Sequence, residues 1–131
     1  MDNMAFNFEK EIVVRNAYDT TSDPKEYGYN SWREYWEDHG HNRSELKSNR
    51  TNVKLKNGKH KFVEVYQCLA CGEYFQWDGE LPNNFDGCHV YIKGEGQDKQ
   101  YIFPFCHSCN HSKDEFKVPS DLLVSAPQKK N

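Results

Sequence analysis

The sequence predicts a small α+β domain, and three observations lead to this fold class. An aromatic stripe with helical spacing lies near the N-terminus, an Asn-Gly turn joins two strand-like runs, and two Cys-x-x-Cys pairs lie in the second half. The length of 131 residues fits a single domain. We divide it into an N-terminal extension (1–66), a cysteine-bearing core (67–118) and a C-terminal tail (119–131).

The composition predicts a cytoplasmic protein with few aliphatic residues in its core. Apolar residues make up 36% of the chain and aromatic residues 15%, so large rings must supply much of the buried area. No run of 18 apolar residues occurs, and the first ten residues lack the apolar segment of a secretory signal. In a reducing compartment, the five cysteines are expected to be metal ligands or free thiols rather than disulfides.

The first helix is expected to begin after Ser31, which forms a capping box with Glu34. Four aromatic side chains then share one helical face, and Gly40 ends the helix. These side chains are Trp32, Tyr35, Trp36 and His39. We interpret the stripe as core packing rather than as a base-stacking surface. Before this helix, we expect a short strand at residues 12–14 and a loop at residues 20–28.

A β-hairpin is expected around Asn57-Gly58, the signal of a two-residue type I′ turn. Residues 53–56 and 59–66 supply its strands, and the polar stretch 41–52 before them is expected to be a loop. Residues 41–66 carry seven basic and two acidic side chains, against four and nine in residues 1–40. We expect four lysines on a common face: Lys54, Lys56, Lys59 and Lys61. They would bind nucleic-acid phosphates or, alternatively, protect a sheet edge from aggregation.

The two cysteine pairs predict one structural Zn²⁺ per chain, because four thiolates in paired spacing form closed zinc sites. The ligands are Cys68, Cys71, Cys106 and Cys109. Gly72 suits a tight turn after the first pair. We expect two strands, 88–93 and 100–105, between the pairs and a helix from the second pair to about residue 117. A knuckle, a hairpin and a helix in this order make the ββα treble-clef arrangement.

A second group of polar side chains lies near the second pair. Adjacent strand residues point to opposite faces, so only one of Cys88 and His89 can face the helix. His107 and His111 share one face of the expected helix. A cluster of His89, Asn110 and His111 is what a second, catalytic divalent metal would require.

The segment Gly87-Cys88-His89-Val90, followed by Phe105 to Lys113, resembles the HNH nuclease motif, a treble clef with a second metal site. The resemblance covers about residues 68–117. The chain is also similar to a group of small bacterial and phage treble-clef proteins, through its Trp-rich helix and the segment 101–110. The resemblance implies that His89 is the general base and that Asn110 is the last metal-binding position.

Three departures from the HNH pattern predict a degenerate site. Cys88 stands where an acidic residue is expected, and a soft thiolate suits Mg²⁺ poorly. Gln100 or Tyr101 stands where an Asn would orient the catalytic His, and Tyr91-Ile92 stands where a Pro is usual. We therefore expect weak or absent nuclease activity.

Three functions remain open from the sequence. The first is a zinc-stabilised, HNH-like domain that binds nucleic acid without efficient cleavage. The second is a metal-dependent endonuclease that uses His89. The third is a phage or mobile-element protein that binds a host nucleoprotein or defence complex. We expect no membrane partner.

Overall fold

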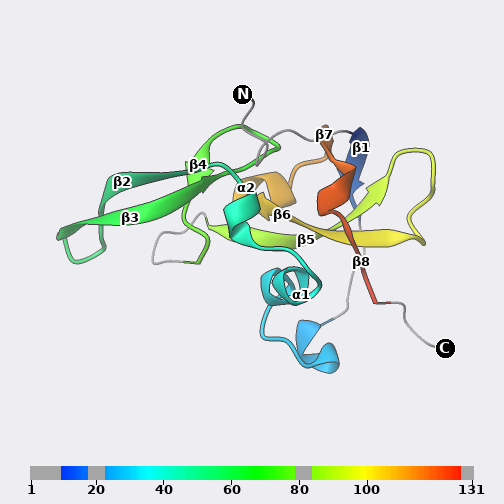
Figure 1. The fold of residues 1–131 in the computed structure, drawn as a ribbon, viewed down its shortest axis with the longest axis horizontal. Coiled ribbons are helices and arrows are strands. Elements are labelled where there is room, and N and C mark those ends of the chain that lie inside the picture. The colour runs from blue at the N-terminus through cyan, green and yellow to red at the C-terminus, as the bar shows by residue number, and fades with distance from the viewer. Residues whose placement is uncertain (1–9, 18–22, 79–83, 128–131) are drawn as a thin grey trace.

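In this computed structural model, residues 10–17, 23–78 and 84–127 are described, and they form a small α+β fold of eight strands and few helical turns. The strands lie in two sheets (Figure 1). None of the helices in the described ranges has the length and apolar character needed to cross a membrane. Three parts of the chain discussed above lie outside these ranges: residues 1–9, residues 20–22 of the expected loop, and residues 128–131.

The larger sheet has five antiparallel strands in the order β7-β1-β5-β6-β8. These strands are β1 (Glu11–Asn16), β5 (Phe85–Ile92), β6 (Gln100–Cys106), β7 (Glu115–Pro119) and β8 (Val124–Ser125). The strand expected at residues 12–14 and the hairpin between the cysteine pairs are confirmed. The central pair β5–β6 carries three fully buried rings, Phe85, Phe103 and Phe105.

Helix α1 (Trp32–Asp38) covers one face of this sheet, as Figure 1 shows. The Ser31 hydroxyl accepts a hydrogen bond from the Glu34 amide at 3.2 Å, which confirms Ser31 as the N-cap, the first half of the expected capping box. Trp32, Tyr35 and Trp36 are buried, so these three members of the aromatic stripe are core, as expected, whereas His39 is exposed. Gly87 on β5 allows the close approach, because a Cβ there would lie 2.4 Å from the Trp32 carbonyl carbon.

The C-terminal segment is attached to α1 and is part of the fold through residue 126. The Trp36 indole donates to the Leu122 carbonyl at 2.7 Å, and the Tyr35 hydroxyl donates to the Ser125 carbonyl at 2.9 Å. Leu122 lies in the 3₁₀ turn η4 (Ser120–Leu122), and β8 pairs with β6. The last strand expected at residues 122–124 is therefore present, as β8 (Val124–Ser125), and this part of the C-terminal segment contributes to the core.

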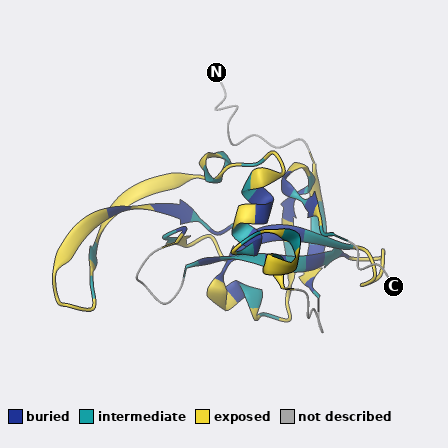
Figure 2. Cartoon of the chain, turned by 90° about the horizontal axis from the view of Figure 1, so that it is seen from below, coloured by how far each residue is buried: buried dark blue, intermediate teal, exposed yellow. Residues whose placement is uncertain are grey.

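The smaller sheet, in the order β2-β3-β4, forms an extension that leaves the body of the protein. Strands β2 (Ser48–Lys54) and β3 (His60–Gln67) make a long hairpin, and β4 (Tyr74–Phe75) pairs with the inner end of β3. We call residues 47–67 the arm. Figure 2 shows it curving away from the body with a largely exposed outer part.

Two expectations about the arm are wrong. Residues 48–52 are strand rather than loop, because the pairing that starts at the turn continues to Ser48↔Tyr66. The turn itself has three residues, 56–58, since the Leu55 amide bonds to the Lys59 carbonyl and Lys54 pairs with His60. Gly58 takes a positive φ of 85° there, which suits a three-residue hairpin loop.

The longer turn shifts the pairing register by one residue, and such a shift exchanges the faces of one strand. Lys61 pairs with Val53, so it lies on the face opposite Lys54. The expected common face of Lys54, Lys56, Lys59 and Lys61 is therefore corrected: Lys54 and Lys61 lie on opposite faces, and the other two lie at the tip.

The helix expected after the second cysteine pair is also shorter than predicted. Helix α2 spans only His107–Asn110, and the chain then forms β7, which pairs with β1. Phe116 and Val118 alternate with exposed residues on β7 and contact the core. Burying these two side chains in the sheet is therefore more favourable than extending the helix.

Candidate metal centres and nucleic-acid interface

The four paired cysteines converge at one end of the β5–β6 hairpin. Their sulfur atoms all lie within 4.8 Å of one another, so they could hold a metal ion such as zinc. The members are Cys68, Cys71, Cys106 and Cys109. A tetrahedral site with Zn–S bonds of about 2.3 Å has sulfur atoms about 3.8 Å apart. The Cys71 and Cys106 sulfurs are 4.0 Å apart, which fits this geometry.

Backbone hydrogen bonds position the first pair. The Gly72 amide donates to the Cys68 carbonyl at 2.7 Å, and the Cys68 amide donates to the Glu73 carbonyl at 2.8 Å. Gly72 has φ 81°, so this tight turn requires a residue without a Cβ, as the sequence predicted. The Cys106 amide lies 3.4 Å from the Cys68 sulfur and donates to it. Such a bond stabilises a thiolate.

The second pair is held by a buried side chain on β1. Asn16 is 6% exposed, and its Nδ2 donates to the Cys109 carbonyl at 2.8 Å and to the Ser112 carbonyl at 2.9 Å. The turn that carries Cys109 is therefore tied to the middle of the large sheet. The role of Asn16 could not be predicted, because nothing in the sequence relates residue 16 to residues 109–112.

The electrostatics of the cluster favour a cation. Burial, followed by the neighbouring thiol groups, raises the pKa of Cys106 to about 11, and the pKa of Cys109 is raised further by the same causes. Four sulfurs at this separation repel as thiolates unless a positive charge lies between them. A divalent ion supplies that charge and deprotonates the thiols.

A second group of potential ligands lies on the outer side of α2. Asp86, His107 and His111 each offer one ligand atom, and these atoms lie within 4.8 Å of one another. The Asp86 Oδ2 atom is 2.7 Å from His107 Nδ1 and accepts a hydrogen bond from the Asn110 amide at 3.0 Å. In contrast to Cys68, Cys106 and Cys109, both histidines are exposed. We call Asp86, His107, Asn110 and His111 the Asp86 group.

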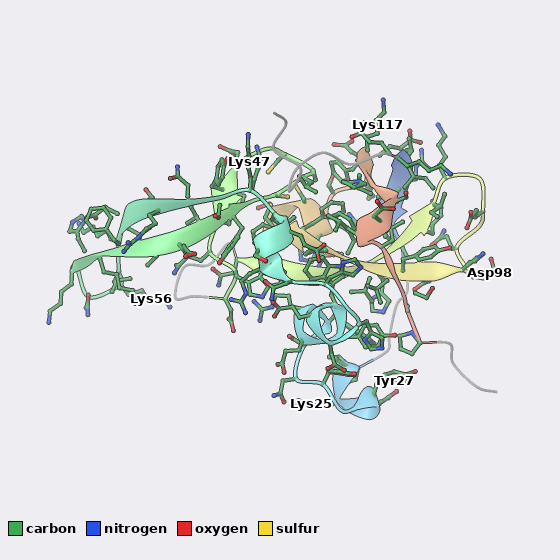
Figure 3. All side chains as sticks on the ribbon, in the orientation of Figure 1. Lys25, Tyr27, Lys47, Lys56, Asp98 and Lys117 are labelled. Carbon is green, nitrogen blue, oxygen red and sulfur yellow. The ribbon has the colours of Figure 1, made fainter. Side chains whose placement is uncertain are left out.

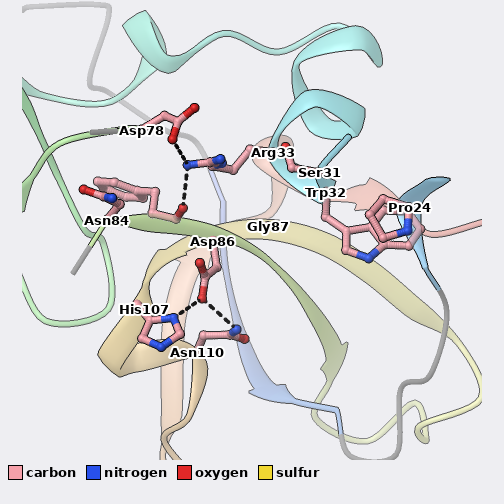
Figure 4. Close-up of a pocket in the computed structure, with 11 residues that line it drawn as sticks. Pro24, Ser31, Trp32, Arg33, Asp78, Asn84, Asp86, Gly87, His107 and Asn110 are labelled. Carbon is pink, nitrogen blue, oxygen red and sulfur yellow. Dashed lines mark hydrogen bonds and ion pairs between the residues drawn. The ribbon is translucent and has the colours of Figure 1, made fainter. Parts of the chain in front are cut away.

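Three members of the Asp86 group, Asp86, His107 and Asn110, border a cleft of about 420 Å³ between α1 and the start of β5 (Figure 4). Arg33 of α1 lines the same cleft. Its guanidinium donates to the Trp77 and Phe85 carbonyls and lies 3.4 Å from Asp78. The cleft thus holds a fixed cation on one wall, while His107 and Asn110 lie on another.

His89 lies on the other face of β5. It is three residues from Asp86, so strand alternation directs the two side chains to opposite faces. Its ring contacts Trp32 at a centroid distance of 4.7 Å, and burial lowers the pKa of His89 to about 4. The structure therefore places Asp86 rather than His89 beside His107 and Asn110, which corrects the expected grouping of His89 with Asn110 and His111.

The residues expected to assist His89 are also engaged elsewhere. Cys88 is 1% exposed, and burial holds the pKa of its thiol well above the usual value. Gln100 Nε2 donates to the Gln97 carbonyl, and the Tyr101 hydroxyl contacts Glu95, so both serve the turn between β5 and β6. The residue that pairs with His89 on β6 is Ile102, which has no polar side chain.

The arm is the third candidate surface. Residues 47–67 carry six basic side chains and one acidic side chain, whereas the rest of the chain carries eleven and nineteen. Within the described ranges, none of the six arm cations forms an ion pair, although Arg15, Arg33 and Arg43 of the body do. Figure 3 shows Lys56 on the outer part of the arm, away from the body.

Comparison of the chain with protein-family models, with curated proteins and with solved structures gave no match. The function is therefore inferred from the chemistry of these three surfaces.

Proposed function

We propose that this protein is a zinc-stabilised, treble-clef-type domain that binds nucleic acid through the arm. One observation carries the proposal: a net charge of five positive units is concentrated on an exposed hairpin, while the remaining chain is acidic. Unpaired cations on a protruding ribbon attract phosphates, and the acidic body repels them. Contact is thereby restricted to the arm.

The four-cysteine cluster supports the zinc part of the proposal. It joins the inner end of β3 to the end of β6, because Cys68 directly follows the arm and Cys106 ends the β5–β6 hairpin. A metal at this point fixes the base of the arm relative to the large sheet. Zinc would therefore act on binding indirectly, by holding the arm in place.

The proposal is tested by titrating labelled duplex DNA with the protein at several salt concentrations and measuring fluorescence anisotropy. Changing Lys54, Lys56, Lys59 and Lys61 to Gln should flatten the slope of log K against log salt by three to four units, at about 0.9 per phosphate contact. The matched control changes four exposed body lysines, Lys10, Lys25, Lys99 and Lys117, by the same net charge. An equal effect of both sets would reject the arm as the binding surface.

The Asp86 group supports a second candidate, metal-dependent cleavage of phosphodiesters. Two imidazoles and a carboxylate suit Mn²⁺, Ni²⁺ or Zn²⁺ better than Mg²⁺. Such an ion, when bound, acts as a Lewis acid toward a phosphate oxygen. In this chain Asn110 would orient Asp86, and Arg33 would provide positive charge across the cleft. His89 has no place in this scheme, because it faces α1.

A plasmid-nicking assay with each metal tests the second candidate. Asp86→Asn and His111→Ala should abolish any cleavage that His89→Gln leaves intact. If cleavage requires His89 and not Asp86, the assignment fails and the endonuclease implied by the HNH resemblance is favoured. If no metal supports cleavage, the domain is a binder, in line with the departures from the HNH pattern.

A further inference from the structure

We infer that one face of the arm is a stacking surface for unpaired bases, so that the arm prefers single-stranded nucleic acid to duplex. This inference rests on the proposed nucleic-acid binding and specifies its partner. The starting observation is Phe62 of β3, which is 66% exposed, more than any other large hydrophobic side chain in the described ranges.

The register of the arm defines the residues around Phe62. Directly paired residues share a face, and Phe62 pairs with Asn52, His60 with Lys54, and Glu64 with Arg50. Figure 1 shows that this hairpin extends beyond the body, so the face lies away from the core near its outer end. The opposite face of β3 contains Val63 and Val65, which are buried. Val63 and Val65 therefore supply the buried side chains of this part of β3, and Phe62, on the other face, is not required for packing.

Two rings lie in a row on the exposed face. Phe62 and His60 are two residues apart on one strand, which is about 6.6 Å at 3.3 Å per residue. The His60 ring is held by a hydrogen bond of 2.9 Å between its Nδ1 and the Asn52 Oδ1. Aromatic side chains spaced along a strand stack successive bases in single-strand-binding sheets. Phe62 and His60 offer this arrangement.

Cationic side chains flank the two rings. Lys54 lies across from His60, and Arg50 lies one pair beyond Phe62 on the same face. Both are exposed, and neither forms an ion pair with a described residue. A base stacked on a ring brings its phosphate toward the rim of the ribbon, where these cations lie. The combination of a ring and adjacent positive charge binds single strands with little sequence preference.

Duplex binding is less well matched to this face. A ribbon that reads the major groove needs free donors and acceptors aimed at base edges. Here the centre of the face is the Phe62 ring, and the neighbouring Asn52 and His60 already bond to each other. Duplex DNA keeps its bases stacked inside and offers Phe62 only groove edges. Unpaired bases, in contrast, expose the whole ring surface for stacking.

Fluorescence anisotropy with a single strand and with a duplex of the same sequence, at one salt concentration, tests this inference. Phe62→Leu keeps an apolar side chain but removes the ring, and it should weaken single-strand binding roughly ten-fold or more while duplex binding changes little. Phe62→Trp should restore or strengthen single-strand binding. Tyr74→Leu is the matched control. Tyr74 lies on β4, and within the described ranges it is the other large hydrophobic side chain that is exposed.

The outcomes separate this inference from the proposed function. If both nucleic acids bind through the lysines and Phe62→Leu changes neither affinity, the stacking surface is rejected and the proposed function stands. An equal loss for single strand and duplex rejects it as well. If neither nucleic acid binds the wild-type protein, the proposed function fails, and the inference fails with it. Unchanged circular dichroism and metal content show that the variants are folded.

Discussion

Helix α2 separates two ligand clusters that differ in almost every physical respect. On its inner side, three of the four cysteines are buried and their sulfurs converge. On its outer side, the members of the Asp86 group are exposed or half-buried and already bond to one another. In the inner cluster, burial raises the pKa values of Cys106 and Cys109, so a cation is needed before all four cysteines become thiolates. The outer cluster is stable as a hydrogen-bonded group, so a metal is not needed to complete the fold.

The comparison shows that a ligand set can serve stability or chemistry according to its exposure. A closed, buried set contributes its binding energy to folding, whereas an open set beside a cleft leaves coordination positions for a ligand. The two clusters should therefore respond differently to the loss of one ligand.

The largest expected effect follows from breaking the inner cluster. Structural zinc contributes on the order of 10 kcal/mol in small domains, which rivals a typical net stability. Cys109→Ala, or removal of metal with a chelator, should therefore unfold the region around α2 and the base of the arm. Zinc content by mass spectrometry and the thermal melting curve measure the effect.

Cys88 provides the matched control for this experiment. It is as buried as Cys106 but lies outside the cluster. Cys88→Ala should keep one zinc per chain and lose only about 1 kcal/mol from a small cavity. A Cys109→Ala protein with full zinc and an unchanged melting curve would show that the cysteines do not form a metal site.

A smaller effect is expected from Asn16, which supports the inner cluster from β1. Asn16→Ala removes the side-chain donor to the Cys109 and Ser112 carbonyls. The Cys109 carbonyl keeps the Ser112 amide as a donor at 3.1 Å, so one carbonyl, that of Ser112, loses its Asn16 donor, at a cost of about 1–3 kcal/mol. The stability loss by urea unfolding should fall in this range, and zinc affinity should weaken in parallel. A loss of stability with unchanged zinc affinity would mean that Asn16 supports only the sheet.

His89 should make stability depend on pH. Its folded-state pKa, about 4, lies below the ordinary value of 6.5, so the unfolded chain binds the proton more readily. Stability is therefore lost as pH falls from about 6.5 toward 4, by on the order of 2 kcal/mol at pH 5. Release of a bound metal at low pH would add to this loss, so the informative quantity is the difference between wild type and His89→Gln across this range. An unchanged difference between pH 7 and pH 5 would contradict the burial of a neutral His89.

The same contrast explains how much could be predicted from the sequence. The inner cluster could be predicted because the two cysteine pairs have a fixed local spacing. Helix α1 could be predicted because Ser31, Glu34 and the aromatic stripe are all local signals of one helix. Asp86 was missed because the sequence Asn-Asn-Phe-Asp-Gly reads as turn chemistry, whereas β5 begins at Phe85. Its partners His107 and Asn110 are brought near by the pairing of β5 with β6, which no local pattern specifies.

Errors elsewhere have similar physical causes. The arm register depended on one residue in the turn, and this difference moved Lys61 to the other face. Residues 115–117 were expected to continue a helix, although Phe116 and Val118 alternate as in a strand. Its pairing with β1, about one hundred residues away, decides the outcome.

The smallest effect on stability, and the clearest test of the comparison, is expected at Asp86. The carboxylate is about one-third exposed, its partner His107 is exposed and Asn110 is half-buried, so Asp86→Asn should change the melting temperature little. Titration calorimetry with Ni²⁺ or Mn²⁺ on the zinc-loaded protein should show a weak site in the wild type and none in this variant. Asp114→Asn, an exposed carboxylate near the same turn, should keep the site. If Asp86→Asn instead unfolds the protein or removes the structural zinc, the two clusters form one cooperative unit, and exposure does not separate their roles.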